Sequence, residues 1–223
     1  MTAAESTSWK IETGLVDYPY AHAFMEKTVQ GIISRKSPEL IWCLQHPPLF
    51  TAGTSAKEHD LFNPLGFPVY SVGRGGQYTY HGPGQLVVYV MVNLEHRQKD
   101  VHQFVKTLEQ WGIDTLNHFG IHAERREGRP GLWVVDTVEE KIAAIGVRIT
   151  KWVTWHGMAI NIHPNLDHFQ GIIPCGLRDF GVTSFEKCGR TATILDVIDT
   201  LQKTCPYQIA PHSAINKHTA NTK

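Results

Sequence analysis

One cysteine of this chain stands where a nucleophile could stand. Cys175 lies in the sequence IPCG, between a proline and a glycine that stiffen and expose the backbone. A lone cysteine is more often a small buried side chain within an apolar run, as Cys43 is. The cysteines Cys43, Cys175, Cys188 and Cys205 form no C-x-x-C pair, so neither a disulfide framework nor a zinc ribbon is indicated. Cys175 is therefore the candidate nucleophile.

A lysine heads a second stretch, EKIAAIG, at residues 140–146. The residues that follow Lys141 are small enough for a chain or a ligand to lie against them. A lysine at the start of a strand is usually just solvated. Taken alone, this stretch is weak evidence for a site.

The third stretch is a glycine-rich segment, GRGGQYTYHGPGQ, at residues 73–85. Its glycines and proline predict a turning loop that approaches something closely, rather than a helix or a flat strand. It lacks the G-K-[ST] ending of a P-loop and precedes a strand instead of a helix, so neither a P-loop nor a Rossmann motif is indicated. A tight bulged turn without function is the alternative. Residues 86–94 then form an apolar run, typical of a strand covered on both faces.

Together, five segments resemble one family. They are HPPLFTAG (46–53), RGGQYTYHGPGQ (74–85), EKIAAIG (140–146), HGMAINI (156–162) and IIPCGL (172–177). They are similar to segments of the octanoyl-(acyl carrier protein):protein octanoyltransferases of lipoate biosynthesis, over about residues 10–200. The resemblance implies an α/β domain with the catalytic fold of biotin and lipoate protein ligases, a large mixed sheet flanked by helices. Val90 departs from the family, which commonly has proline there.

The resemblance also implies roles for individual residues. Cys175 would carry the acyl group as a thioester, and Lys141 would activate it. The residues implied to line the acyl site are Arg74, Gly75, Gly76, Gln77, Tyr78, Thr79, Tyr80, His81, Ala144, Ile145, Gly146, Gly157, Met158 and Ala159. No cofactor and no metal are implied. The implied partners are octanoyl-acyl carrier protein as donor, and as acceptors the lipoyl domains of 2-oxoacid dehydrogenases and the glycine cleavage H protein.

The chemistry of this reaction suits these residues. Moving an acyl group from a thioester to a lysine amine is thermodynamically downhill, so no nucleotide is needed to activate it. What the reaction needs is a nucleophile that can exchange thioesters, and a thiolate is such a nucleophile. A free cysteine has a pKa of about 8.5, and a nearby ammonium lowers it. Lys141 would then act as an acid or base in each half-reaction. His81 would orient the substrate, shuttle a proton or make only a structural hydrogen bond.

Two other classes of protein remain open at this stage. An ATP-dependent lipoate or biotin ligase of the same fold would use the glycine-rich segment to hold an adenylate, but such a ligase needs no thiol. A non-enzymatic metal-binding or acyl-carrier-binding protein would use histidines near Cys175, namely His156, His163 and His168. Their spacing matches no standard zinc pattern.

The chain has 223 residues, and its composition is typical of an ordinary globular protein. The formal net charge is zero, so the sequence lacks the excess of positive charge that is typical of proteins that bind nucleic acid or an anionic membrane. The sequence shows no transmembrane run and no signal peptide, so we expect a cytoplasmic protein. We expect one catalytic domain at residues 9–206, with a disordered N-terminus at 1–8 and a flexible tail at 207–223.

The helices and strands that position these residues are predicted from the spacing of the apolar residues. This spacing predicts helices from Asp17 to Pro38, from Asp100 to Gly120 and from Thr193 onward. Strands are expected at residues 9–15, 40–44, 49–52, 68–72 and 86–94, followed by an antiparallel meander at 121–125, 132–135, 141–149 and 153–162. Residues 53–64 and 163–180 are expected to be irregular.

Overall fold

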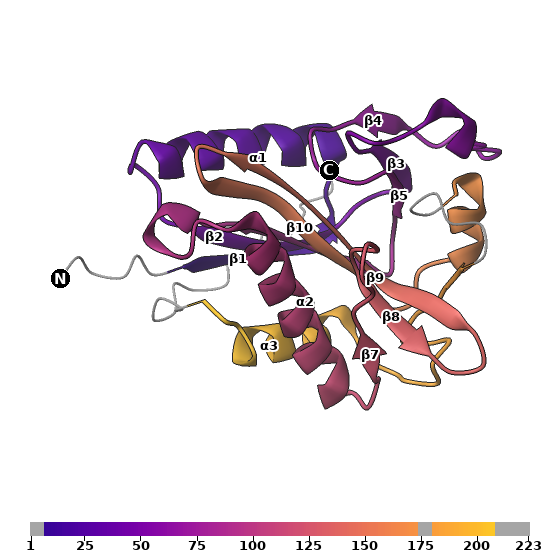
Figure 1. The fold of residues 1–223 in the computed structure, drawn as a ribbon. Helices are drawn as coiled ribbons and strands as arrows, with labels where there is room; N and C mark the ends of the chain where they lie inside the picture. Colours follow the sequence, from indigo (N-terminus) through magenta and orange to yellow (C-terminus); the bar gives the residue numbers. More distant parts are fainter. Residues whose placement is uncertain (1–6, 174–179, 208–223) are drawn as a thin grey trace, which may run out of the picture.

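The computed structural model describes residues 7–173 and 180–207. A large mixed sheet forms its centre, with the strand order β1-β2-β6-β10-β9-β8-β7 and with β11 paired to β9 (Figure 1). The strands are β1 (Ser8–Leu15), β2 (Leu40–Gln45), β6 (Gln85–Met91), β7 (Ala123–Glu124), β8 (Leu132–Val135), β9 (Glu139–Thr150), β10 (Val153–Asn161) and β11 (Gly181–Val182). Strands β7 to β10 are the antiparallel meander that the sequence predicts.

Three helices cover this sheet. Helix α1 (Tyr18–Ile33) lies on one face, and α2 (Val101–His118) and α3 (Ile194–Lys203) lie on the other (Figure 1). Strand β6 is buried along its whole length, because alternate residues enter two different cores. Leu86, Val88 and Val90 pack on the side of α2 and α3, whereas Val87, Tyr89 and Met91 pack on the side of α1. The predicted covered strand is confirmed.

Some predicted boundaries are wrong. Helix α1 ends at Ile33 and does not reach Pro38, because Arg35 adopts a left-handed conformation with φ 56° and Lys36 donates to the carbonyl of Gly31. Strand β6 ends at Met91, short of the predicted end at Leu94, which instead begins a 3₁₀ turn, η2 (Leu94–His96). The two segments expected to be irregular contain further 3₁₀ turns, η1 (Glu58–Asp60) and η3 (Leu166–Gly171).

The glycine-rich segment contains a strand, contrary to our expectation of a loop. Residues Tyr78–His81 form β5, which pairs with β3 (Leu49–Ala52), and β4 (Val69–Ser71) completes a small second sheet. The turns lie on either side of β5, at Gly76 and Gly84, where φ is +85° and +83°. Between them, the residues YTYH favour an extended backbone. The small sheet lies beside one end of α1 (Figure 1).

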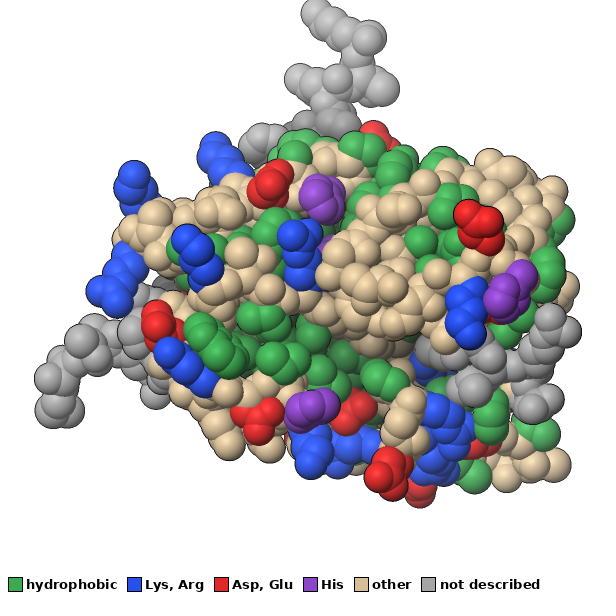
Figure 2. Space-filling model, turned by 45° about the horizontal axis from the view of Figure 1, so that its top comes forward, with side chains coloured by type: hydrophobic (Ala, Val, Ile, Leu, Met, Phe, Trp, Pro, Cys, Tyr) green, Lys and Arg blue, Asp and Glu red, His purple; other side chains and the backbone are tan. Residues whose placement is uncertain are grey.

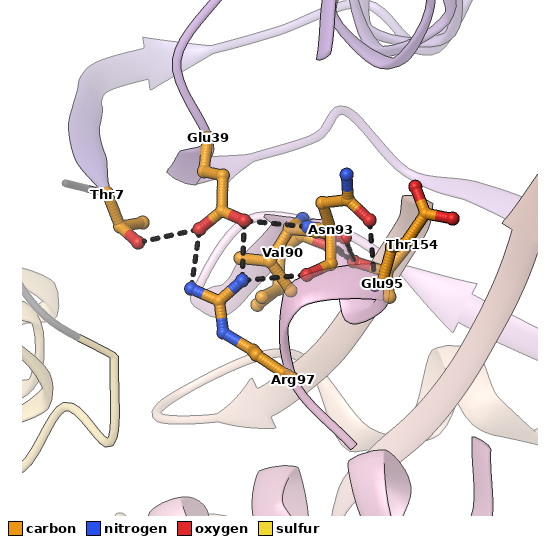
Figure 3. Close-up of polar contacts among 8 residues, drawn as sticks. Thr7, Glu39, Val90, Asn93, Glu95, Arg97 and Thr154 are labelled. Atoms are coloured by element: carbon orange, nitrogen blue, oxygen red, sulfur yellow. Dashed lines mark hydrogen bonds and ion pairs between the residues drawn. The ribbon is translucent and has the colours of Figure 1, made fainter. Parts of the chain in front are cut away.

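A buried carboxylate ties the beginning of the domain to its centre (Figure 3). Glu39, at the start of β2, is 1% exposed and accepts hydrogen bonds from both terminal nitrogens of Arg97, at 2.5 and 2.7 Å. It also accepts from the hydroxyl of Thr7 and from the backbone N–H of Asn93. Thr7 is buried and Ser8 already belongs to β1, so these two residues are part of the fold.

Charges of both signs are mixed at the surface. Figure 2 shows apolar side chains gathered across the middle of one face, above a rim on which basic and acidic side chains are interspersed. Among the residues that the structure describes, no helix is both long and apolar enough to cross a membrane.

Candidate active site

A pocket lies between one face of the large sheet and the glycine-rich segment, which includes β5. Its floor is made of residues that pair across β6, β10 and β9 and therefore share one face. These are Gln85, Val87 and Tyr89, then Asn161, Ala159 and Gly157, then Ala144 and Gly146. Most of them are small or apolar, so the floor is a largely apolar trough.

Nearly all the residues implied by the resemblance meet in this pocket. Lys141 lines it, together with Arg74, Gly75, Gly76, Gln77, Tyr78, Thr79, His81, Ala144, Ile145, Gly146, Gly157, Met158 and Ala159. The two glycines of the floor are needed where they stand. A Cβ on Gly157 would lie 2.3 Å from the carbonyl of Val88, and one on Gly146 would lie 3.0 Å from Arg74 Cδ.

Tyr80 is the implied residue that does not line the pocket in the described part of the chain. Its side chain is fully buried in the cluster with Phe50 and Phe169, behind the pocket wall. Its hydroxyl lies 2.7 Å from His168 Nδ1, and burial raises its pKa to about 12. Because strand side chains alternate, Tyr80 faces away from the side to which its neighbours Thr79 and His81 contribute.

Arg74 holds the glycine-rich segment on the floor. Arg74 is 7% exposed, and its guanidinium donates to both the carbonyl and the hydroxyl of Thr51, at 2.8 and 2.7 Å. The next residue, Gly75, donates its N–H to the carbonyl of Val147 on β9. Gly53 allows the closest approach, since a Cβ there would lie 2.2 Å from the carbonyl oxygen of Gly76. The segment therefore binds the small sheet to β9.

Lys141 is buried, although a lysine at this place is usually solvated. It is 5% exposed, its Nζ donates to the carbonyl of Pro130 at 2.8 Å, and the ammonium lies 4.8 Å from the ring centre of Trp133. Strand β9 is held here on both edges, because Lys141 pairs with Trp133 of β8 and with Val182 of β11. The register between β8 and β9 shifts next to this pair. Leu132, the neighbour of Trp133, pairs with Ala143 rather than Ile142, so β9 has one extra residue here. This bulge places Lys141 on the face of Ala144.

Several pocket residues were not identified from the sequence. Tyr18, from the first turn of α1, and Tyr89, from β6, line the pocket along with Thr51, Gln85, Val87, His156, Asn161, Phe169 and Val182. The sequence suggests His156 only as a candidate metal ligand. The alternation of β6 could have shown that Gln85, Val87 and Tyr89 share a face, but not that this face carries the pocket.

Burial keeps the histidines around the pocket neutral. It lowers the pKa of His46 to about 4 and that of His156 to about 3, and Arg74 adds to the effect on His156. His46 Nδ1 donates to the carbonyl of Val16, and its Nε2 lies 2.8 Å from the hydroxyl of Tyr89. His156 has φ 59° within β10 and is 4% exposed. The His46 ring therefore acts as a neutral hydrogen-bonding group.

Cys175 lies outside the described residues. Of the other cysteines, Cys43 belongs to the core, where burial raises its pKa, and burial also raises the pKa of Cys205 to about 11. Neither suits a thiolate nucleophile. Within residues 7–173 and 180–207, no cluster of three His, Cys, Asp or Glu side chains could hold a metal ion.

Comparison with known proteins decides the family. The sequence model of the lipoyl protein ligase A/B catalytic domain matches residues 17–205. This chain belongs to that family. Within the family, it is 52% identical to an octanoyltransferase from Parvibaculum lavamentivorans, over 91% of this chain and 92% of that protein. It is 54% identical to an octanoyltransferase from Paramagnetospirillum magneticum, over 89% and 94% of the two chains.

Solved structures confirm the expected fold. A bi-partite lipoate protein ligase from Thermoplasma acidophilum matches with a TM-score of 0.65 and 16% identity, covering 90% of this chain and 82% of that one. A lipoate-protein ligase A bound with ATP matches with a TM-score of 0.65 and 14% identity, covering 94% and 90%. At these identities, the likeness concerns the family's fold alone.

Proposed function

We propose that this protein is an acyltransferase of lipoate biosynthesis, which moves an octanoyl group from octanoyl-acyl carrier protein to a lysine of lipoyl domains. The observation that carries the proposal is the pocket itself, in which an apolar trough of small residues meets the buried Lys141. The relatives that are about half identical over nine-tenths of this chain are named octanoyltransferase. The resemblance to ligases, by contrast, is one of fold.

The trough suits a medium-length alkyl chain. Gly146, Gly157, Ala144 and Ala159 leave room above the floor, and Val87 adds apolar surface. Each methylene moved from water into such a site contributes about 0.8 kcal/mol. The acyl chain would lie along β9 and β10, with its carbonyl near Lys141.

In the proposed mechanism, Cys175 is the nucleophile. Its thiolate attacks the carbonyl of the octanoyl thioester, the bond to the carrier sulfur breaks, and the carrier leaves as a thiol after gaining a proton. The lysine amine of the acceptor then attacks the enzyme thioester, an amide forms, and the Cys175 thiolate departs. Lys141 supplies the proton in the first step and removes one from the amine in the second. The carbonyl of Pro130 holds its Nζ at the pocket wall.

The proposed partners are those that the resemblance to octanoyltransferases implies. The donor is octanoyl-acyl carrier protein, and the acceptors are lipoyl domains of 2-oxoacid dehydrogenases and the glycine cleavage H protein. The protein would meet them in the cytoplasm. No nucleotide is consumed, since an acyl thioester already carries the energy needed to form an amide.

The requirement for nucleotide tests the proposal against the ligase alternative. We expect octanoylation of a lipoyl domain with octanoyl-acyl carrier protein and no ATP or magnesium, measured by the mass of the acceptor domain. Free octanoate should remain inert even when ATP and magnesium are added. Transfer from free octanoate that depends strictly on ATP would assign the protein to the ligases.

A further inference from the structure

A chain of hydrogen bonds connects His81 to two main-chain carbonyls. His81 Nδ1 lies 2.7 Å from Gln85 Oε1. The amide nitrogen of Gln85 donates to the carbonyl of Tyr80 at 3.2 Å and to Asn161 Oδ1 at 3.1 Å. The amide nitrogen of Asn161 then donates to the carbonyl of Thr183 at 2.9 Å. His81, Gln85 and Asn161 all line the pocket and are at most 7% exposed.

The two carbonyls set the direction of the whole chain. A carbonyl oxygen can only accept, so the amide nitrogens must face Tyr80 and Thr183. Turning the Gln85 amide round would set its oxygen against the carbonyl of Tyr80. Its oxygen therefore faces the imidazole, and because this oxygen can only accept, His81 Nδ1 must carry the hydrogen.

The other ring nitrogen is left as an acceptor. Burial lowers the pKa of His81 well below its usual value, and His46, Arg74 and His156 add to the effect, so the ring is neutral. A neutral imidazole protonated at Nδ1 has a lone pair at Nε2. His81, whose ring carries this acceptor, lines the pocket together with Lys141.

The two reactants of the proposed transfer, the octanoyl chain and the lysine amine, differ in their hydrogen-bond donors. The octanoyl chain has no hydrogen-bond donor. The attacking amine has N–H groups, and it must turn its lone pair toward the thioester carbonyl. An acceptor that binds one N–H fixes this orientation, which is a condition for a fast attack.

We propose that Gln85 and Asn161 are positioning residues that hold His81 in its Nδ1–H tautomer, so that His81 Nε2 accepts a hydrogen bond from the attacking lysine amine. This role rests on the proposed function, whereas the tautomer does not. The amine keeps this hydrogen while it is bound, and Lys141 remains the group that takes the proton. Asn161 acts only through Gln85, and Gln85 only through the ring.

The tautomer is tested by long-range ¹H–¹⁵N NMR spectra of the imidazoles, in which the two neutral tautomers have different patterns. The signals of His81 are those absent from His81→Asn. We expect the Nδ1–H pattern in the wild type and a mixture in Gln85→Met, which keeps the side-chain length and loses the acceptor. An Nε2–H pattern in the wild type would overturn the proposal. The wild-type spectrum decides the question even if Gln85→Met does not fold.

The role of the ring is tested by separating the two half-reactions. Release of the carrier thiol without acceptor measures acyl loading, and octanoylation of an added lipoyl domain measures attack by the amine. In His81→Asn, the side-chain amide can replace Nδ1 toward Gln85 but offers nothing at the position of Nε2. We expect attack by the amine to slow about tenfold, as for the loss of one hydrogen bond, while loading changes less than about twofold.

Two kinetic results would overturn the assignment to the amine. One is an unchanged rate of attack in His81→Asn. The other is an equal loss in both half-reactions, which would mean that the ring binds the carrier side of the thioester. A wild type that transfers no octanoyl group would contradict the proposed function, and the NMR spectrum would still test the tautomer.

Discussion

Lys141 depends on a glycine for its position. Gly131 has φ +124°, and a Cβ there would lie 3.2 Å from Lys141 Nζ and 2.5 Å from the carbonyl oxygen of Ala143. The preceding carbonyl, that of Pro130, accepts the hydrogen bond from Nζ. One short turn therefore provides both the space beside the ammonium and its acceptor.

Alanine at this position should displace the ammonium. We expect Gly131→Ala to lower the rate of octanoyl transfer by about 10²-fold, the loss typical of a group displaced by about 1 Å. Gly128→Ala is the matched control, because Gly128 lies in the same turn at φ +71° but a Cβ there meets nothing within 4 Å. Gly128→Ala should lose roughly 1 kcal/mol of stability through its positive φ, and Gly131→Ala should lose more, because its Cβ also meets the carbonyl oxygen of Ala143. Equal activities in the two variants would show that Gly131 has no special relation to Lys141.

At the scale of elements, the Glu39 cluster fixes how β1, β2 and the end of β6 meet. The carboxylate is 1% exposed, and its partner Arg97 reaches it with both terminal nitrogens (Figure 3). Removing one partner of a buried ion pair leaves a charge without compensation, which typically costs 3–5 kcal/mol. The hydrogen bond from the backbone of Asn93 would remain and would face an uncompensated carboxylate.

We therefore expect Arg97→Met to lower the free energy of unfolding by roughly 3 kcal/mol, measured by urea denaturation. The control is Lys99→Met, which removes the exposed ion pair between Lys99 and Glu95, from the same part of the chain. That change should cost less than about 0.5 kcal/mol. A similar small loss in Arg97→Met would mean that water replaces the guanidinium at no great cost.

Some helices and strands could be predicted from the sequence and others could not. Periodicity predicts α2, the buried β6 and the meander, because each of these patterns extends over many residues. The strand β5 was missed because only four residues, Tyr78–His81, separate its flanking turns. The bulge in β9 belongs to its pairing with β8, which is a tertiary effect without a local signal.

The same limit applies to the site. The resemblance supplied the residues of the glycine-rich segment, and most of them do line the pocket. It could not separate Tyr80, which does not line the pocket, from Tyr78, which belongs to the same buried cluster and does line it. Tyr18 reaches the pocket only because α1 packs beside β6, and no motif indicates such a residue.

At the scale of the whole molecule, the neutral histidines make the fold sensitive to acid. An unfolded histidine has a pKa of about 6.5, whereas burial lowers the pKa of His46 to about 4 and that of His156 to about 3. Below about pH 6.5, the unfolded chain binds protons that the folded chain excludes, so stability falls as the pH falls. The loss continues until the folded pKa is reached.

We expect the free energy of unfolding to fall by roughly 2 kcal/mol or more between pH 7 and pH 5, measured by urea denaturation. His156→Phe should reduce this pH dependence by the share of one histidine, roughly 1.4 kcal/mol per pH unit below 6.5. His122→Gln, at an exposed histidine, is the control and should leave the slope unchanged. An unchanged slope in His156→Phe would mean that His156 takes up a proton in the folded protein.

The most direct test of the account is the intact mass of the protein after mixing with octanoyl-acyl carrier protein, with no acceptor present. We predict one covalent octanoyl adduct on the wild type and on Cys43→Ala, Cys188→Ala and Cys205→Ala, and none on Cys175→Ala. The adduct should disappear when a lipoyl domain is added, and the domain should gain the octanoyl group. An adduct that persists on Cys175→Ala, or efficient transfer by that variant, would contradict the assignment of Cys175 as the nucleophile.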